Sequence, residues 1–227
     1  HKFRALGQWV IFQMGQIGVN KGAAPDANFG TAAETSAAFL VPCARIDKCV
    51  QIGFFAPLIL VSHPLSMVAG REVLGMAKQL AEFTGTMPAS LDDTVVSTTT
   101  SDRSGPSTPI TINPLIRVRR TGAAPPTGGF ARSLVEHVVS GRSVTFFNVR
   151  QLRAVGDPQM ASTSELVRGR MTLGHVDLQP FSSGHEIVIE PWASHPIASL
   201  FGFPSGPLSP VLSAKFHVDE ASLDVEP

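Results

Sequence analysis

Apolar and β-branched residues gather in short runs along this chain, and turn-forming residues separate most of the runs. Glycine (20 residues) and proline (18 residues) are frequent across the 227 positions. This punctuation favours antiparallel strands joined by turns, and it argues against a bundle of long helices. The predicted strands span residues 9–19, 38–44, 49–61, 108–118, 144–152, 170–178, 186–189 and 211–218.

Two of these runs differ in how regularly apolar and polar residues alternate. Apolar and polar residues alternate in 171–178, Met-Thr-Leu-Gly-His-Val-Asp-Leu, which predicts one buried face and one polar face. Residues 211–218 alternate less regularly and are also predicted to form a strand. The strands therefore outnumber every other predicted element.

Helical signals are fewer. Residues 64–72 begin with proline and predict a short helix. Residues 194–201 predict a second helix, with Ser194 as N-cap and Pro196 in its first turn. Residues 131–139 fit a helix or a strand, and the stretches 97–109 and 122–129 are expected to be mobile loops. The predicted fold class is mainly β (α+β), with two or three short helices.

Composition narrows the range of partners. The length of 227 residues favours a single domain over residues 1–227. Hydrophobic residues make up 43% and charged residues 16% of the chain, which indicates a well-buried core. Eighteen basic and eighteen acidic residues leave no net charge, so neither nucleic acid nor an anionic membrane is an expected partner. No apolar run reaches the roughly 18 residues that a membrane helix needs.

Cysteine usage bears on the compartment. Cys43 and Cys49 are the only cysteines, and their spacing matches no zinc or redox motif. We expect free thiols in a reducing, cytoplasmic compartment, with a local disulfide as the alternative. The first residue is His1 rather than Met, so we also expect the natural N-terminus to have been processed or to extend further.

Lys78 is the candidate for chemistry. The chain has five lysines against thirteen arginines, and Lys78 stands among apolar residues that include Leu74, Met76 and Leu80. A lysine held in apolar surroundings has a lowered pKa, because burial disfavours the charged ammonium. The resulting free amine can form a Schiff base with a ketone. The alternative is an ordinary lysine whose head group reaches solvent along an amphipathic segment.

Residues 70–80, Gly-Arg-Glu-Val-Leu-Gly-Met-Ala-Lys-Gln-Leu, resemble the signature of the acetoacetate decarboxylase superfamily. That signature is Gly-Arg-Glu followed by Gly-x-Pro-Lys-Lys-Leu, and its first lysine, the Schiff-base nucleophile, falls on Lys78. Weaker similarity extends to residues 146–153, 174–178 and 194–203. The resemblance implies a curved antiparallel sheet closed into a cone-like β-barrel, a lysine in a central apolar cavity, no cofactor, and assembly into a homo-oligomer.

The chain departs from the family pattern at several positions. Gln79 stands in place of the second lysine, and Ala77 replaces the proline. Of the two glutamates that line the family's cavity, one matches Glu34 and the other falls on Gln13, which carries no charge. Arg4 is a candidate for the family's N-terminal arginine by position only. Recognition of a substrate carboxylate is therefore the least defined part of the predicted site.

The predicted catalytic residues are Lys78, Glu34 and Gln13. Glu34 would handle a proton or repel a substrate carboxylate, and Gln13 would orient a carbonyl or water. No metal or nucleotide site is predicted, because the histidines lack ligand spacing and no phosphate-binding loop occurs. Residues predicted to line the substrate site, or to hold the helix that presents the lysine, are Arg71, Glu72, Gln79, Phe12, Phe54 and Met76.

Three functions follow from these residues. The leading hypothesis is a cofactor-independent lyase that acts on a small keto acid, most simply by decarboxylating a β-keto acid. The second is an aldolase-dehydratase that uses the enamine formed on Lys78. The third is a non-catalytic barrel that binds an apolar small molecule, which the uncharged and hydrophobic character of the chain would also suit.

Overall fold

The computed structural model describes residues 2–21, 31–46, 49–85, 92–102, 109–123, 143–154, 157–181, 183–210, 214–218 and 220–226, with residues 133, 136, 140 and 141. Strands dominate these residues, which confirms the mainly β prediction. The chain divides into two compact units. Unit 1 comprises His1–Gln79, Gly141–His175 and Val218–Pro227, and unit 2 comprises Leu80–Ser140 and Val176–His217. The single-domain organisation stays a prediction.

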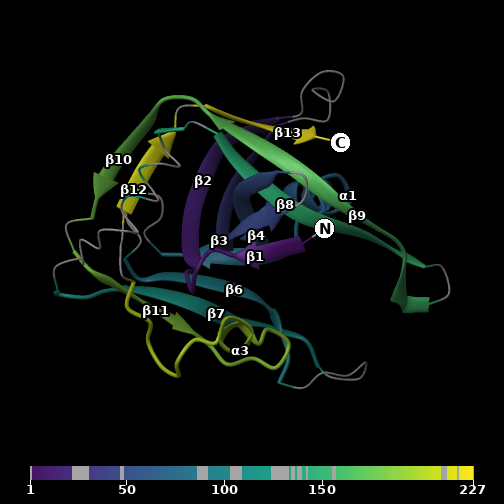
Figure 1. Cartoon of the computed structure of the whole chain (residues 1–227). Coiled ribbons are helices and arrows are strands. Elements are labelled where there is room, and N and C mark those ends of the chain that lie inside the picture. The colour runs from purple at the N-terminus through teal and green to yellow at the C-terminus, as the bar shows by residue number, and fades with distance from the viewer. Residues whose placement is uncertain are drawn as a thin grey trace. The chain divides into compact units, whose positions relative to one another are not determined.

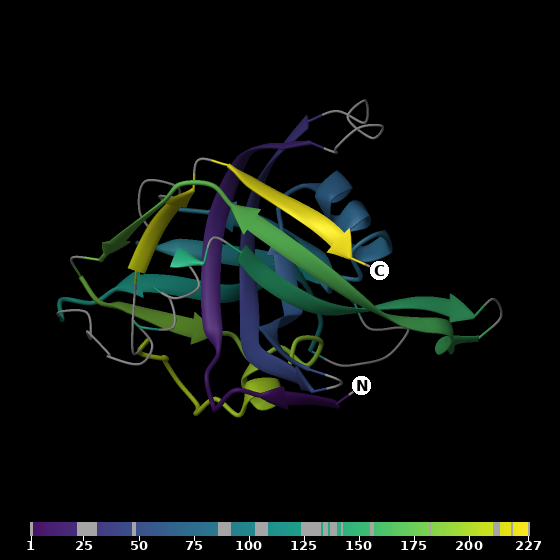
Figure 2. The same ribbon diagram turned by 45° about the horizontal axis from the view of Figure 1, so that its top comes forward.

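Unit 1 is a sheet with one helix. Its strands β1 and β2 both pair antiparallel with β3, and β3 pairs antiparallel with β4. β4 meets β8 in parallel, and β8, β9 and β13 continue the sheet antiparallel. Figures 1 and 2 show β8 and β9 as a long two-stranded ribbon. The elements are β1 (Lys2–Ala5), β2 (Ile11–Lys21), β3 (Thr31–Ile46), β4 (Val50–Val61), α1 (Pro64–Glu72), β8 (Ser143–Ala154), β9 (Asp157–Leu173) and β13 (Ala221–Glu226).

Unit 2 is built on a second run of antiparallel strands, in the order β5, β6, β7 and β11. β10 and β12 form a separate two-stranded sheet. The first two residues of β5, Lys78 and Gln79, and the last residue of β12, Val218, belong to unit 1. The elements are β5 (Lys78–Thr84), β6 (Thr94–Thr100), β7 (Thr111–Arg120), β10 (Val176–Pro180), β11 (His185–Ile189), α3 (Ile197–Phe201) and β12 (Ala214–Val218).

Each unit has its own apolar core. Long side chains that leave neighbouring strands on the same face fill the space beside the sheet, which removes apolar area from water. In unit 1 the most deeply buried include Phe39, Leu60, Val61 and Phe147, and in unit 2 they include Val96, Leu115, Ile116 and Val118. No helix among the described residues is long and apolar enough to cross a membrane.

β6 corrects the prediction of a loop at residues 97–109. Residues 97–100 belong to this strand, and alternate threonines, Thr94, Thr98 and Thr100, are buried. The hydroxyl of Thr98 donates a hydrogen bond to the carbonyl of Leu80 at 2.7 Å, which satisfies it inside the unit. β-branched threonine suits a strand once its hydroxyl has a partner, so the polar composition was misleading. Residues 103–108 lie outside the described part of the chain.

The strand predicted at residues 170–178 is divided. β9 ends at Leu173 and β10 begins at Val176. Between them the Gly174 amide donates to the carbonyl of Glu220 at 2.7 Å. A Cβ at Gly174 would lie 3.0 Å from that same oxygen, a tight contact that glycine avoids. The alternating pattern is therefore interrupted by a bend that the glycine permits.

The second predicted helix is shorter than expected. α3 begins at Ile197, and Pro196 occupies the N-cap position without a side-chain cap. Ser194 does not cap the helix, because its hydroxyl accepts a hydrogen bond from the amide of Ser101 at 3.0 Å. Most of the segment 131–139, and residues 124–129 of the second expected loop, lie outside the described residues.

The predicted closure into a cone-like barrel is wrong for the described residues, because the strand pairings in each unit form an open path. In unit 2 the outer edge of β11 is occupied by Leu208, which exchanges two backbone hydrogen bonds with Ile187, of 2.9 and 2.8 Å. In unit 1 the path ends at β13, which carries Asp224 and Glu226. Acidic residues at an edge discourage further strand pairing.

Candidate active site

Helix α1 spans Pro64–Glu72, the range in which a helix that begins with proline was predicted. His63 is the N-cap, and its Nδ1 accepts a hydrogen bond from the amide of Leu65 at 3.2 Å. Pro64 supplies a fixed φ at the first helical position, where no amide hydrogen is needed. Ser66 and Gly70 are the buried residues of this helix. They are four positions apart and therefore lie on one face, one turn from each other.

A tight turn after α1 returns the chain toward the helix. Gly75 adopts a φ of +63°, in the left-handed region that favours glycine, and a Cβ there would lie 2.8 Å from the backbone nitrogen of Arg150. The amide of Met76 then donates to the carbonyl of Gly70 at 2.9 Å. The carbonyl of Ala77 accepts from the amide of Ile59 on β4 at 3.0 Å. These bonds fix the backbone immediately before Lys78.

The aliphatic stem of Lys78 lies against the backbone of Gly70. A Cβ built on Gly70 would lie 2.4 Å from Cδ and 2.7 Å from Cε of the lysine. No carbon atoms approach so closely without one of them moving. Glycine at this position therefore leaves the space that the lysine side chain occupies, which gives a physical reason for the first residue of the Gly-Arg-Glu motif.

The amine of Lys78 meets two polar groups from other elements of unit 1. Its Nζ lies 2.7 Å from Oγ of Ser66 on α1 and 3.5 Å from Oε2 of Glu34 on β3. The hydroxyl of Ser66 donates to the same carboxylate oxygen of Glu34. The exposed fractions of the two charged side chains are 11% for Lys78 and 3% for Glu34. The lysine head group is thus held inside the protein rather than at the surface.

Two opposing effects set the protonation of this amine. Burial lowers the pKa of the Lys78 ammonium below its usual value and is the larger effect. The charge of Glu34 and its hydrogen bond act in the opposite direction. Because burial dominates, the unprotonated amine is more abundant near neutral pH than it is for a solvent-exposed lysine. An unprotonated amine is the form that attacks a carbonyl carbon.

Gln13 shares a sheet face with Glu34 but lies at a distance from it. Gln13 on β2 pairs with Ala38, four residues along β3 from Glu34. Cross-strand partners and alternate residues point to the same face, so Gln13, Ala38 and Glu34 leave the sheet on one side. At about 3.3 Å per residue, the separation along the strand is about 13 Å.

The predicted aromatic residues do not gather around the amine. Phe12 packs on Phe39 with ring centroids 5.1 Å apart, and its position next to Gln13 places it on the opposite face of the sheet from Glu34. Phe54 pairs with Pro42, eight residues along β3 from Glu34, or roughly 25 Å at the usual strand rise. Both side chains contribute to packing where the structure places them.

The remaining predicted residues lie close to Lys78 in the sequence, apart from Arg4 on β1. Met76 is buried two residues before the lysine. Arg71 and Glu72 are exposed at the end of α1, and the carbonyl of Glu72 accepts a hydrogen bond from Nη1 of Arg150 at 3.4 Å. Gln79 follows Lys78 directly in β5, so its side chain leaves from the other face of the strand. Arg4 lies on β1 opposite Ala44 and is exposed.

Ser66 is the residue that sequence reasoning missed. It contacts both charged groups of the site, although nothing in its immediate sequence suggests chemistry. The available signal was its spacing of four from Gly70, which places a hydroxyl and a glycine on the same helix face. That signal gains meaning only once the Lys78 side chain is known to cross this face.

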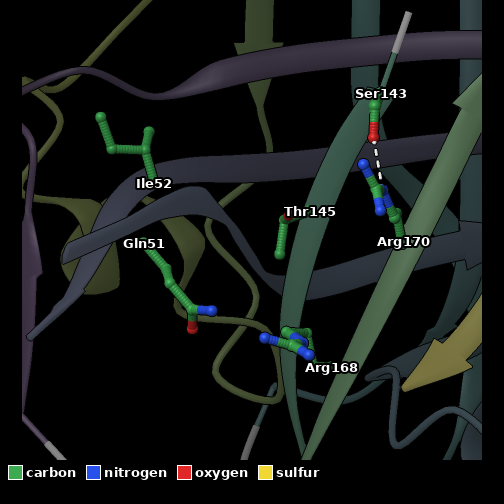
Figure 3. Close-up of a pocket in the computed structure, with 6 residues that line it drawn as sticks. All are labelled: Gln51, Ile52, Ser143, Thr145, Arg168 and Arg170. Carbon is green, nitrogen blue, oxygen red and sulfur yellow. Dashed lines mark hydrogen bonds between the residues drawn. The ribbon is translucent and has the colours of Figure 1, made fainter. Parts of the chain in front are cut away.

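A separate hollow of about 300 Å³ lies in unit 1, among β4, β8 and β9 (Figure 3). Its lining is mostly polar, and Nε of Arg170 donates to Oγ of Ser143 at 3.0 Å. It lies near the start of β4, whereas the backbone anchor of the lysine segment, Ile59, lies near the end of that strand. The hollow is therefore distinct from the amine. Its lining residues are Gln51, Ile52, Ser143, Thr145, Arg168 and Arg170.

The described residues include no group of three or more His, Cys, Asp or Glu side chains placed to hold a metal ion. Cys43 is buried and Cys49 is exposed, and both are free thiols. Burial raises the pKa of the Cys43 thiol. The groups that meet at the candidate site in unit 1 are the amine of Lys78, the hydroxyl of Ser66 and the carboxylate of Glu34.

The fold is mainly β, and its candidate site is a lysine amine buried beside a carboxylate. The family model described as acetoacetate decarboxylase (ADC) matches residues 10–203. The chain belongs to the acetoacetate decarboxylase family. The matched span contains Glu34, Ser66, Gly70 and Lys78.

One solved structure supports the fold, and two others are similar over less of their structure. An acetoacetate decarboxylase from Legionella pneumophila superposes with a TM-score of 0.60 at 15% identity, covering 99% of this chain and 74% of that one. A second acetoacetate decarboxylase gives a TM-score of 0.49 at 11% identity, covering 87% and 69%. The enduracididine biosynthesis enzyme MppR, complexed with pyruvate, gives 0.42 at 13% identity, covering 84% and 66%. A search of curated proteins gave no significant match.

Proposed function

We propose that this protein is a cofactor-independent lyase that forms a Schiff base between Lys78 and a small keto acid, and that it most simply decarboxylates a β-keto acid. The observation that carries the proposal is the buried Lys78 amine, which contacts Ser66 and lies 3.5 Å from the carboxylate of Glu34. Burial favours the unprotonated form of this amine, which is the nucleophile that the reaction needs.

The chemistry begins when the unprotonated Nζ of Lys78 attacks the ketone carbon. Loss of water gives a protonated imine, whose positive charge withdraws electrons from the adjacent carbon–carbon bond. A β-carboxylate then leaves as carbon dioxide, and the electron pair of the broken bond is retained as an enamine. Protonation at carbon and hydrolysis return the free amine and a ketone. Glu34, whose Oε2 lies 3.5 Å from the nitrogen, is the carboxylate that would take up and return a proton.

A second candidate uses the same amine. In an aldolase-dehydratase the enamine adds to an aldehyde, and the adduct then loses water. The observation that favours it is Gln13, an uncharged residue that shares the sheet face of Glu34 where the family has a second glutamate. Such an enzyme would accept a pyruvate-like substrate and would release no carbon dioxide from acetoacetate.

Borohydride trapping tests the proposal. The protein is incubated separately with acetoacetate and with pyruvate, reduced and digested, and the peptide that contains Lys78 is examined by mass spectrometry. We expect a reduced adduct on Lys78, because burial lowers the pKa of this amine. Lys2 and Lys215 belong to the same chain and serve as internal controls for nonspecific labelling.

The outcomes separate the three functions. Adduct formation with acetoacetate and release of one carbon dioxide per turnover supports the decarboxylase. Adduct formation with pyruvate, without carbon dioxide from acetoacetate, transfers the proposal to the aldolase-dehydratase. Folded protein that gives no adduct with either keto acid contradicts both, and leaves a ligand-binding protein that does not use the amine.

The contact between Gly70 and Lys78 gives a further prediction. Gly70→Ala is expected to keep or slightly raise stability, since alanine is favoured over glycine in a helix by about 1 kcal/mol. The added methyl would, however, occupy the place of the lysine stem and displace the amine. We expect Schiff-base formation to slow by about 10²-fold, the order that a misplacement of about 1 Å can cause. Thermal unfolding and the trapping rate are the two measurements.

Val68→Ala is the matched control, because Val68 is exposed on the same helix and 50% accessible. It should leave both the trapping rate and the melting temperature close to those of the wild type. A Gly70→Ala protein that traps keto acid at the wild-type rate would mean that the lysine stem can move aside without displacing the amine.

A further inference from the structure

We propose that Ser66 is a positioning and proton-relay residue, through which Lys78 and Glu34 exchange a proton during Schiff-base formation. The inference rests on the proposed function and adds a residue that the lysine motif does not contain. Ser66 comes from α1, whereas Glu34 comes from β3 and Lys78 opens β5. Its hydroxyl oxygen is the nearest of the two oxygens to the amine, at 2.7 Å against 3.5 Å for Glu34.

The direction of the hydrogen bonds defines what Ser66 can do. Its hydroxyl hydrogen is donated to Oε2 of Glu34, so its oxygen is the acceptor for an N–H of Lys78. A hydroxyl group has one donor hydrogen and two acceptor lone pairs, and this arrangement uses the donor and one lone pair. In the ammonium state one N–H of Lys78 is therefore directed at Oγ of Ser66.

This geometry orients the nucleophile. When the ammonium loses a proton, the nitrogen has two hydrogens and one lone pair. The relayed proton leaves the nitrogen lone pair facing Oγ of Ser66, and rotation about the Cε–Nζ bond then turns that lone pair toward a carbonyl carbon and places a remaining N–H on Oγ. The packing of the lysine stem on Gly70 limits the other rotations of the side chain. A near-attack geometry of this kind is a large part of the advantage of an enzyme over solution chemistry.

The relay also closes the proton balance of the reaction. The Lys78 ammonium gives one proton to Ser66 as the hydroxyl proton of Ser66 moves to Glu34, which leaves a neutral amine and a protonated carboxyl. The amine attacks, a carbon–nitrogen bond forms, and a second proton moves from nitrogen to the alkoxide. The carbon–oxygen bond then breaks, and the proton held by Glu34 leaves with the hydroxyl as water. The three protons of the ammonium are accounted for, one on the imine and two in water.

Burial makes the relay useful. Ser66 is 6% exposed and Glu34 is 4% exposed, so bulk water has little access to the proton path. A proton that solvent cannot collect must pass through protein groups, and a hydroxyl between donor and acceptor supplies that path. General acid–base assistance from a positioned side chain contributes about 10²- to 10⁴-fold to a rate.

The test compares four proteins by rapid-quench borohydride trapping, with whichever keto acid labels the wild type. Ser66→Ala removes the hydroxyl. Ser66→Thr and Ser66→Val introduce side chains of the same shape, and only the threonine carries a hydroxyl, so this pair separates the hydroxyl from packing effects. Circular dichroism and thermal unfolding establish that each variant is folded.

We expect Ser66→Ala and Ser66→Val to form the adduct about 10²-fold more slowly than the wild type, while reaching the same final amount of adduct. Ser66→Thr should be at least tenfold faster than Ser66→Val, because it restores the hydroxyl. Equal rates in the threonine and valine variants, or a wild-type rate in folded Ser66→Ala, would overturn the role of Ser66. Absence of any adduct in the wild type is a different result, and it contradicts the proposed function itself.

Discussion

Replacing Lys78 with methionine is expected to abolish adduct formation and to lower turnover by about 10⁴-fold or more, within the range seen when a covalent nucleophile is removed. Methionine has a similar length and keeps the stem that packs on Gly70, but it has no amine. Turnover is measured as carbon dioxide release from acetoacetate, and adduct formation by trapping. Folded Lys78→Met protein that retains activity would contradict the lysine mechanism.

Stability needs a control in this experiment, because Lys78→Met leaves the carboxylate of Glu34 buried without its cation. Breaking a buried ion pair from one side costs about 3–5 kcal/mol. The double variant Lys78→Met with Glu34→Gln replaces both charges by neutral groups and should recover most of this loss. The double variant should be as inactive as the single one. Regained activity in the more stable double variant would show that the first loss came from unfolding.

Glu34→Gln is expected to separate the protonation of the amine from turnover. Burial lowers the pKa of Lys78, and the Glu34 carboxylate opposes that effect. Removing the carboxylate therefore lowers the pKa of Lys78 further, so that the amine is unprotonated at lower pH. The acidic limb of the trapping-rate profile should move to lower pH. Turnover should fall by about 10²-fold or more, because the group proposed to return the proton is missing.

The profile is measured as the initial rate of trapping against pH, beside carbon dioxide release from the same samples. Glu82→Gln is the matched control, since Glu82 is an exposed carboxylate four residues after Lys78 in β5. It should leave both curves unchanged. An acidic limb that stays in place or moves to higher pH in Glu34→Gln would contradict the electrostatic role assigned to this carboxylate.

Local pattern predicted the elements whose signals are local. Residues 49–61 combine apolar and β-branched side chains, and β4 spans Val50–Val61. The helix at 64–72 has proline at its start, and its bounds are those of α1. Both signals act through short-range backbone preferences, so neither needs the rest of the fold. They place the strand and the helix immediately before the lysine segment.

β6 shows where composition failed. Its Thr and Ser residues favoured a loop on polarity, but a threonine hydroxyl is tolerated in a buried strand when it has a partner. Thr98 finds that partner in the carbonyl of Leu80, eighteen residues away. No window of sequence around Thr98 contains this information. The same reason explains Ser194, whose partner is Ser101 rather than the start of its own helix.

Strand alternation could have sharpened the site prediction. Phe12 and Gln13 are neighbours on one strand, so their side chains cannot both face the same cavity. The cross-strand pairing of Gln13 with Ala38 then decides that Gln13 shares the face of Glu34 and Phe12 does not. The alternation is a local property, but the choice of face depends on register, which the sequence alone left open.

The sequence by itself determined that the chain is mainly β, that a glycine-initiated motif leads to one lysine in apolar surroundings, and that Glu34 is a candidate to handle a proton or repel a substrate carboxylate. Only the tertiary structure decided that Glu34 and Lys78 meet, that Ser66 lies between them, and that Gly70 gives the lysine its space. The physical reason is the range of the interactions. Backbone preference and burial pattern act over a few residues, whereas these contacts join positions up to 44 residues apart.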